Sequence, residues 1–343
     1  MIKTIRWGMV GTGDVTEVKS GPGFYKANNS MLYGVTNRTY HKAVDYAHRH
    51  GVERVYSDID EMIADGKVDA IYIATPPGSH KMYALKCAQA RIPCYIEKPV
   101  AMNYQEHLEL IEAFEKTNTK AFAAYYRRGH ERFKKVKQII DAGEIGDIYF
   151  IHLSLYRGAT ESEKQNQSWR VQPEISGGGI FMDVGVHQLD ILDFLIGKVK
   201  DVTSFRSNKG GFYAPEDTIT AAFVFENGVQ MTADWCFAAG VAKDEIEIVG
   251  SLGRITLSCF GIDEIVVERA SEKEAIQVEV PEHVHQPLIQ TIVDELNGEG
   301  ECPSTLKTAL NTAWICEAIY QVKDTFTGSL QKQQKAKSGF VKK

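Results

Sequence analysis

The sequence predicts an α/β protein: an N-terminal Rossmann domain with a doubly wound parallel sheet, then a C-terminal α+β domain with a large, mostly antiparallel open sheet. Three observations support this fold class. In residues 1–124, short apolar runs alternate with amphipathic ones, which is typical of β-α-β units. A glycine-rich turn follows the first apolar run. From about Tyr149 the apolar period changes to two, which indicates half-buried antiparallel strands.

Residues 1–124 are expected to form the first domain, with a boundary near residues 122–126. The predicted strands span residues 4–10, 31–36, 70–74, 93–97 and 120–124. The predicted helices run from the glycine turn to about residue 27 and over residues 40–50, 78–90 and 103–116. Asn103 is the expected N-cap of the last of these helices.

Residues 125–330 are expected to form the second domain, and residues 331–343 a flexible, polar and basic tail. The runs that alternate with period two are IYFIHLSLYR, VTSFRS, ITAAFVF, VQMTADWCF, DEIEIVG, RITLS, EIVVE and IQVEV. Asn227-Gly228 predicts a hairpin turn between two of them. Helices are expected over residues 130–142, 180–196 and 305–325, the second closed by Gly197.

Composition excludes several classes of protein. The chain has 343 residues, of which 43% are hydrophobic and 24% charged, with a net charge of -6. No basic bias suggests a nucleic-acid partner, and no apolar run reaches membrane-spanning length. The six cysteines form no C-x-x-C pair, and the N-terminus does not read as a signal peptide. We therefore expect a cytoplasmic protein with reduced thiols.

The turn Gly8-Met9-Val10-Gly11-Thr12-Gly13-Asp14-Val15-Thr16 fits the first two glycines of G-x-G-x-x-G, with Thr16 in place of the third. The first glycine makes a tight turn, and the second lets the backbone approach a pyrophosphate at a helix N-terminus. A purely structural turn is the alternative interpretation. The residues expected to bind a dinucleotide here are Gly11, Thr12, Gly13, Asp14 and Val15.

The end of the second predicted strand bears on the choice of cofactor. NAD sites usually place Asp or Glu there for the ribose hydroxyls, but residues 36–38 are Thr, Asn and Arg. Asn37 can donate hydrogen bonds, and Arg38 can pair with a 2′-phosphate. This favours NADP, and the alternative is NAD with a solvated Arg38.

Two loops follow predicted strands at the sheet edge where open α/β sheets bind ligands. One loop carries Glu97-Lys98-Pro99, in which Lys98 is either catalytic or a solvated charge. The low frequency of cis X-Pro bonds favours a trans peptide bond between Lys98 and Pro99. The other carries Thr75, Pro76 and His80, which either line a nicotinamide pocket or form an ordinary connection.

The segment GGGIFMDVGVHQLD places Asp183, His187 and Asp190 on one face of an otherwise apolar helix. Buried polar groups need partners, so Asp183 and His187 either satisfy each other or face a polar cavity. The candidate roles are a core hydrogen-bonded pair, a proton-transfer dyad or two metal ligands. No third ligand is evident nearby, and no metal is expected.

Together, the GTGD turn, the EKP loop and the GGG-x₃-D-x₃-H segment resemble the glucose–fructose oxidoreductase/inositol dehydrogenase (Gfo/Idh/MocA) family. The resemblance implies a Rossmann domain followed by an α/β domain, and oxidation or reduction of sugars, cyclitols or related polyols with NAD(P). It also implies that the open sheet face forms an interface, so a homodimer or homotetramer is expected. In this family the bond between the lysine and the proline of EKP is often cis.

The resemblance also assigns residues. Lys98, Asp183 and His187 match the family's lysine and acid–histidine pair and are the expected catalytic residues. Trp169-Arg170 matches a pair near cofactor or substrate, and the segment 125–128 matches the entry to the second domain. Further cofactor contacts are expected from Asn37, Arg38, Thr75, Pro76, His80, Glu97, Lys98, Trp169 and Arg170. The expected substrate contacts are Lys98, Arg128, Tyr156, Trp169, Arg170, Asp183 and His187, with Tyr156 taken from its strand alone.

The resulting hypothesis is hydride transfer between nicotinamide and a sugar alcohol. His187 is expected to take the hydroxyl proton, Asp183 to orient its ring and Lys98 to hydrogen-bond the reacting oxygen; Lys98 is the alternative proton carrier. Three other functions compete: a redox-assisted glycoside hydrolase or lyase with bound NAD(P), a non-catalytic nucleotide- or sugar-binding regulator, and a structural interaction module.

Overall fold

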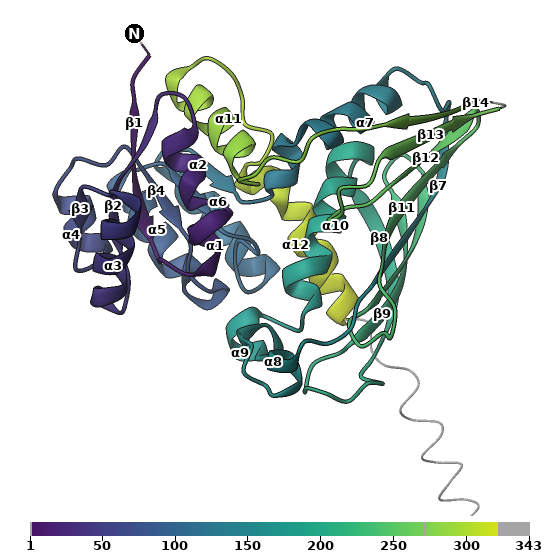
Figure 1. Cartoon of the computed structure of the whole chain (residues 1–343), viewed down its shortest axis with the longest axis horizontal. Coiled ribbons are helices and arrows are strands. Elements are labelled where there is room, and N and C mark those ends of the chain that lie inside the picture. Colours follow the sequence, from purple (N-terminus) through teal and green to yellow (C-terminus); the bar gives the residue numbers. More distant parts are fainter. Residues whose placement is uncertain (1, 271, 322–343) are drawn as a thin grey trace, which may run out of the picture.

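The chain folds into two lobes joined by helices, as the computed structural model shows (Figure 1). The structure describes residues 2–270 and 272–321. The predicted tail at 331–343 and the last four residues of the helix predicted at 305–325 lie outside the described residues. Among the described residues, no helix has both the length and the apolar character needed to cross a bilayer.

The first lobe contains a parallel sheet with the strand order β3-β2-β1-β4-β5-β6. This is the doubly wound order of Rossmann domains, whose ligands bind beyond the carboxyl ends of the strands. The strands are β1 (Ile5–Val10), β2 (Ser30–Thr36), β3 (Arg54–Val55), β4 (Ala70–Ile73), β5 (Cys94–Ile96) and β6 (Ala121–Ala123). The two-residue β3 is too short to show an apolar period, and the sequence analysis did not predict it.

Helices flank this sheet: α1 (Asp14–Val18), α2 (Gly21–Lys26), α3 (Tyr40–His50), α4 (Ile59–Ala64), α5 (His80–Ala90) and α6 (Tyr104–Lys116). The prediction of one helix up to residue 27 was wrong, because the chain breaks between α1 and α2. A side chain at Gly21 would lie 2.1 Å from the carbonyl oxygen of Thr16, and Pro22 begins the second helix. The predicted N-cap is confirmed, since the Asn103 side chain accepts from the backbone N–H of Glu106.

The second lobe contains an eight-stranded sheet in the order β14-β13-β12-β11-β7-β10-β9-β8. Its strands are β7 (Ile148–Tyr156), β8 (Val199–Ser207), β9 (Thr218–Phe225), β10 (Gln230–Cys236), β11 (Lys243–Gly250), β12 (Gly253–Leu257), β13 (Ile265–Arg269) and β14 (Glu272–Ile276). All neighbours are antiparallel except β7 and β10, and Asn227-Gly228 turns the chain between β9 and β10. The strand predicted over IQVEV, residues 276–280, was misplaced, because β14 ends at Ile276.

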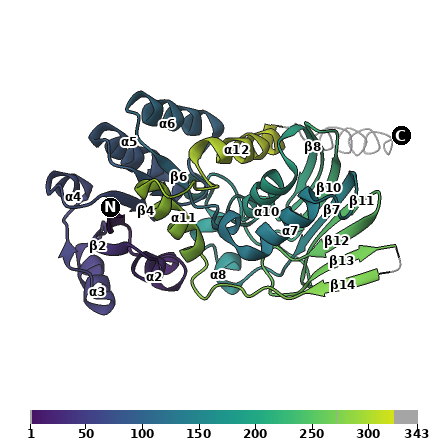
Figure 2. The ribbon, with the colours of Figure 1, turned by 90° about the horizontal axis from the view of Figure 1, so that it is seen from above.

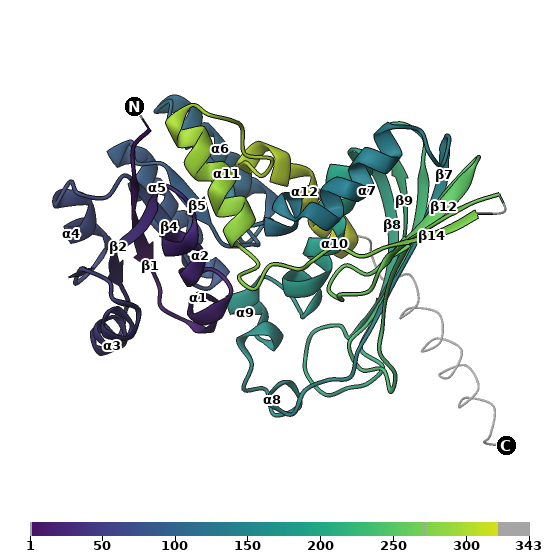
Figure 3. The same cartoon turned by 45° about the horizontal axis from the view of Figure 1, so that its top comes forward.

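One face of this sheet is covered by α7 (Glu131–Asp141), α10 (Phe181–Ile196) and α12 (Leu306–Gln321), which lie between the sheet and the first lobe (Figure 3). Alternation along β7 buries Ile151, Leu153 and Leu155 towards these helices. Phe150 and His152 of the same strand lie on the opposite face and are exposed. The α10 helix, which carries the predicted catalytic residues, is therefore sandwiched between two layers.

The end of the described chain returns to the first lobe. Helix α11 (Gln286–Asn297) contributes Leu288 and Ile289 to a core cluster with Trp7 and Phe24 of the Rossmann domain. Before α12, Ser304 exchanges backbone and hydroxyl hydrogen bonds with Ala123 of β6. Figure 2 shows α12 running from the first lobe to the large sheet. These crossings hold the carboxyl edge of the parallel sheet against α10.

Short helical turns complete the path of the chain between these elements. The 3₁₀ turns are Pro77–Ser79, Tyr126–Gly129 and Trp169–Val171, and the short helices α8 (Glu161–Lys164) and α9 (Pro173–Ser176) precede the glycine run. Trp169–Val171 brings Arg170 to the N-terminal turn of α10.

Candidate active site

Lys98 and Asp183 meet where the two lobes face each other. The Lys98 Nζ atom donates to Oδ1 of Asp183 at 2.5 Å and to its carbonyl oxygen at 2.7 Å. The other carboxylate oxygen accepts from Nε of Arg170 at 2.5 Å, and the Arg170 guanidinium stacks 4.9 Å from the ring centre of Trp169. The Lys98–Pro99 bond is cis, as the resemblance to the family implies and against the general frequency of X-Pro bonds.

The two cations determine the charge of Asp183. Burial by itself would raise the pKa of Asp183, but the charges and hydrogen bonds of Lys98 and Arg170 outweigh it and hold the pKa well below its ordinary value. No hydrogen bond joins Asp183 to His187 among the described residues, so the first of the two alternatives, mutual hydrogen bonding, is not observed. Asp183 therefore orients Lys98, not the imidazole.

His187 lies one turn along α10 from Asp183 and is only 5% exposed. Its ring centre lies 5.1 Å from that of Tyr126 and 6.0 Å from that of Phe260. Burial, followed by the positive charges of Arg127 and Lys98, lowers the pKa of His187 well below its ordinary value. The imidazole is therefore neutral at physiological pH, and its Nδ1 has no hydrogen-bond partner among the described residues.

A second buried cluster lies behind Lys98, where β5 ends. The Tyr72 hydroxyl donates to Glu97, and the Tyr95 hydroxyl lies 2.9 Å from Nδ1 of His285. His285 Nε2 lies 3.6 Å from the Glu97 carboxylate. Burial raises the pKa of Glu97, although the neighbouring ammonium of Lys98 opposes this. Glu97 thus supports the lysine loop from inside the sheet, and its carboxylate is turned towards the core.

The glycine turn has the geometry that a pyrophosphate requires. Gly11 has a φ of +98°, and a side chain there would lie 2.8 Å from the carbonyl oxygen of Ala74. A side chain at Gly13, by contrast, would meet no atom within 4 Å, so the backbone there is open to a ligand. Asp14 and Val15 begin the helix that follows.

The end of β2 is tied to this turn. The Asn37 amide donates to the Thr12 hydroxyl at 2.8 Å, and its oxygen accepts from the backbone N–H of Thr39 at 2.8 Å. Arg38 is exposed at the same edge. The residues at the turn therefore fit a dinucleotide whose adenosine ribose lies next to β2.

His80 ties the two loops of this edge together. It is fully buried, with Nε2 2.6 Å from the carbonyl oxygen of Thr75 and Nδ1 3.0 Å from that of Pro99. Burial lowers the pKa of His80. Its ring nitrogens are both taken by backbone, so His80 holds the Thr75-Pro76 turn against the lysine loop, and the exposed Pro76 lies on the outer side of that turn.

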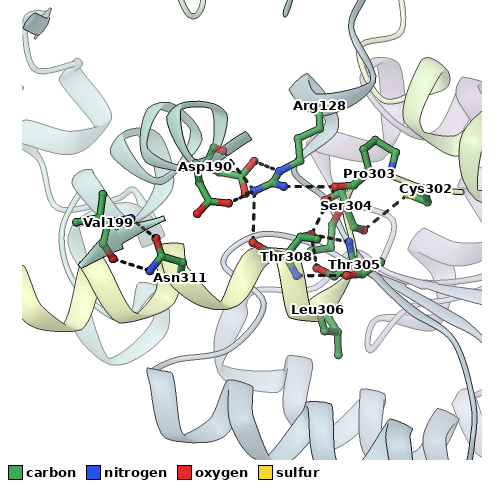
Figure 4. Close-up of polar contacts among 12 residues, drawn as sticks. Arg128, Asp190, Val199, Cys302, Pro303, Ser304, Thr305, Leu306, Thr308 and Asn311 are labelled. Carbon is green, nitrogen blue, oxygen red and sulfur yellow. Dashed lines mark hydrogen bonds and ion pairs between the residues drawn. The ribbon is translucent and has the colours of Figure 1, made fainter. Parts of the chain in front are cut away.

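Arg128 does not join this cluster, although the sequence analysis expected it to contact substrate. Its guanidinium pairs with both oxygens of Asp190 at 2.7 and 2.8 Å and with Asp193 at 3.0 Å. Figure 4 shows it held between Asp190 and the backbone that leads into α12, including the carbonyls of Pro303 and Thr308. These contacts favour a structural role.

Tyr156, which was expected from the sequence to contact substrate, lies away from the Lys98–Asp183 pair. Ile151, Leu153 and Leu155 are the β7 residues that face the helices, so Tyr156 points to the opposite face of the sheet. A strand pattern gives the alternation but not which set of residues faces the site.

Three residues around His187 were not predicted from the sequence: the buried Arg127 and His285, and Phe260, which is 39% exposed. Phe260 and His285 lie in loops far from α10 in sequence, so only the tertiary fold brings them near it. Arg128, and not its neighbour Arg127, was predicted to contact substrate. No group of three or more His, Cys, Asp or Glu side chains in residues 2–270 and 272–321 is arranged to hold a metal.

A Rossmann sheet whose edge carries a glycine turn and a lysine, facing a carboxylate and a buried imidazole on the second lobe, is the arrangement of a dinucleotide-dependent oxidoreductase. Two family descriptions match the chain: an oxidoreductase family with an NAD-binding Rossmann fold over residues 5–125, and the GFO/IDH/MocA C-terminal domain over residues 133–256. The oxidoreductase P35 of Formosa agariphila is 36% identical over 321 residues, which cover 93% of this chain and 99% of that protein. The chain belongs to the Gfo/Idh/MocA family.

Other relatives are more distant. The myo-inositol 2-dehydrogenase of Thermotoga maritima is 26% identical over 257 residues, covering 73% of this chain and 74% of that protein. The crystal structure of the WlbA dehydrogenase from Bordetella pertussis, in complex with NADH and UDP-GlcNAcA, has the same fold. Its TM-score is 0.81 at 22% sequence identity, over 93% of this chain and 95% of that one.

Proposed function

We propose that this protein is an NADP-dependent dehydrogenase or reductase of a sugar, cyclitol or related polyol, with Lys98, Asp183 and His187 as its catalytic residues. One observation carries the proposal: the ion pair of Lys98 with Asp183 lies beside a neutral, buried His187 at the carboxyl edge of a dinucleotide-binding sheet. The name of the Thermotoga maritima relative, an inositol dehydrogenase, supports a polyol as the substrate.

The three side chains have different roles in the reaction. Lys98, fixed by Asp183, donates a hydrogen bond to the reacting oxygen and stabilises the negative charge that develops there. His187 has no proton on one ring nitrogen and takes the proton of the substrate hydroxyl. The dinucleotide, when bound, accepts the hydride at its nicotinamide ring. Arg170, which shares the carboxylate of Asp183, keeps that carboxylate ionised and turned towards Lys98.

The cofactor contacts follow from the loops at the sheet edge. Gly11, Thr12 and Gly13, with Asp14 and Val15, would hold the pyrophosphate, and Thr75 and Pro76 would lie beside the nicotinamide. The absence of Asp or Glu at residues 36–38 and the exposed Arg38 support NADP over NAD. A 2′-phosphate would pair with the guanidinium, with Asn37 as a second donor.

The test of this function is a panel of sugars and cyclitols, each with NAD and NADP, followed by nicotinamide absorbance. We expect turnover with NADP, and a loss of about 10²–10⁴-fold in kcat for Lys98→Ala and for His187→Ala. Lys243→Ala, at an exposed surface ion pair, is the control. Wild-type rates in both catalytic variants would overturn the assignment. Arg38→Leu should weaken NADP binding at least tenfold and leave NAD binding unchanged.

The same residues also suit a redox-assisted glycoside hydrolase or lyase, which would cleave glycosides with no added nucleotide. We favour the dehydrogenase because of the name of the inositol dehydrogenase relative. The panel separates the two, since cleavage without absorbance change would select the second function.

We further propose a homodimer or homotetramer that covers the open face of the large sheet. Phe150 and Phe205 are 39% and 59% exposed. Light scattering that returns the monomer mass would exclude it.

A further inference from the structure

Two adjacent arginines, Arg127 and Arg128, are both buried, with 7% and 3% of their surfaces exposed. Their surroundings differ completely. Arg128 has two carboxylate partners, Asp190 and Asp193. Arg127 has none among the described residues: its Nε donates to the carbonyl oxygen of Cys259 at 3.1 Å, and its solvent-excluded Nη1 has no hydrogen-bond partner.

A buried guanidinium without a counter-ion is unfavourable, because desolvation removes far more free energy than a single neutral acceptor returns. The rings of Tyr126 and Phe260, 4.8 and 4.4 Å from the Arg127 guanidinium carbon, recover only part of this cost through cation–π attraction. The carboxylate on the neighbouring strand β11, Asp244, accepts the backbone N–H groups of residues 259–261 and makes no ion pair with Arg127. Among the described residues, Arg127 therefore makes no direct ion pair, and the charge of Asp244 stabilises the guanidinium only at longer range.

Arg127 also lies at the catalytic residues. The two rings that flank its guanidinium are the same two that flank the imidazole of His187. His187 also carries an unpartnered buried nitrogen, its Nδ1. Two polar nitrogens without partners thus lie beside the same pair of aromatic rings.

The charges of the surrounding groups point to an anion. Lys98 and Arg170 share a single carboxylate, that of Asp183, so this trio has one positive charge in excess. Arg127 adds another. Burial raises the pKa of the other nearby acid, Glu97, whose carboxylate accepts from Tyr72. A neutral polyol would bring no charged partner for Arg127, whereas a ligand carboxylate would pair with its guanidinium directly.

We propose that Arg127 binds a carboxylate of the substrate, so that the sugar on which the proposed dehydrogenase acts is an acidic one, a uronic or aldonic acid. The inference rests on the proposed function and specifies its substrate class. A planar guanidinium pairs with a carboxylate through parallel hydrogen bonds, and no described carboxylate contacts the Arg127 guanidinium.

The test is calorimetric binding to the full chain loaded with reduced nicotinamide cofactor, which prevents turnover of the alcohol. The probes are D-glucuronate, D-galacturonate and D-gluconate, compared with D-glucose and D-galactose, with D-glucose 6-phosphate as the phosphate arm. We expect at least one acid to bind about 10²-fold more tightly than the neutral sugars. Arg127→Met should abolish that preference, and Arg127→Lys, which keeps the charge but not the planar fork, should retain a part of it.

Thermal stability gives a second readout. Because Arg127 makes no ion pair with any described residue, Arg127→Met should leave the unfolding temperature unchanged or raise it, whereas Arg128→Met should lower it. Equal binding of acids and neutral sugars, tighter binding of the phosphate, or unchanged acid binding in Arg127→Met would each overturn the inference. So would a loss of stability in Arg127→Met as large as that in Arg128→Met, since it would show that Arg127 is already paired.

The outcomes also separate this inference from the proposed function. Reduction of the nicotinamide by neutral sugars, without preferential binding of any acid, would keep the dehydrogenase and overturn the acidic substrate. Tight, Arg127-dependent binding of an acid, with no nicotinamide turnover on any sugar, would keep the binding site and overturn the dehydrogenase.

Discussion

Replacing Arg128 by methionine tests how the catalytic helix α10 is held. The guanidinium is 4% exposed, and the carboxylates of Asp190 and Asp193 are 1% and 9% exposed. Methionine keeps most of the volume but removes the one cation among the described residues that pairs with these two acids. It also removes the donors to the backbone that leads into α12, which Figure 4 shows beside Asp190.

The magnitude follows from this burial. Removing one partner of a buried ion pair leaves an uncompensated charge and costs about 3–5 kcal/mol. The matched control is Arg254→Met. Arg254 also pairs with two carboxylates, Glu247 and Glu268, but its side chain is 49% exposed. Exposed pairs contribute about 0–1 kcal/mol, so the control should unfold nearly as the wild type does.

The assay is urea unfolding followed by circular dichroism, with thermal melts alongside. At about 2–4 °C per kcal/mol, Arg128→Met should melt roughly 6–20 °C below the wild type. Adding Asp190→Leu and Asp193→Leu to Arg128→Met should recover much of the loss, because apolar groups then replace the whole network. Equal losses in Arg128→Met and Arg254→Met, or no recovery in the triple variant, would refute the reasoning.

Three further predictions concern the cofactor turn, pH and the catalytic carboxylate. Gly11→Ala should destabilise the fold, because φ is +98° and the new methyl group would lie 2.8 Å from a carbonyl oxygen. Gly13→Ala should melt like the wild type, but fluorescence titration should show that it binds the dinucleotide at least tenfold more weakly. Burial lowers the pKa of His107 and of His130 from 6.5 to about 4, so the unfolded chain takes up these protons at a higher pH than the folded chain does. Stability should therefore be full above pH 6.5 and fall between pH 6.5 and 4, by up to about tenfold in the folding equilibrium per pH unit for each histidine. Melting temperatures that do not change with pH in this range would contradict the prediction. Asp183→Asn should lower kcat by about 10²-fold or more while the cofactor still binds, because the amide removes the negative charge that fixes Lys98 and Arg170. An unchanged kcat would remove Asp183 from the mechanism.

Local patterns predicted most of the fold because burial imposes them directly on the sequence. The helix at Tyr40–His50 was predicted with its observed bounds, and Asn103 caps α6 as expected. The period-two runs predicted nearly all strands of the large sheet, since one of its faces is buried and the other is not. The breaks between α1 and α2 and at the end of β14 were missed. Both depend on close contacts with other segments or on strand pairing, which no local period reveals.

For the candidate site, the sequence determined which kinds of residue are present and on which element each lies. Asp183 and His187 share a face of α10, and Lys98 follows β5, as their spacing required. Only the tertiary structure decided which groups pair. Asp183 forms ion pairs with two cations, Lys98 at the end of β5 and Arg170 in a separate turn. Two positive charges attract a buried carboxylate more strongly than a neutral imidazole does.

The pair Arg127 and Arg128 marks the limit of what the sequence by itself determined. It determined two cations side by side at the entry to the second domain, and nothing local distinguishes one from the other. Folding brings Asp190 and Asp193 to the second arginine and the rings around His187 to the first. The different roles follow from this placement, because the free energy of a buried charge depends on the groups that surround it in space and not on its neighbours in the chain.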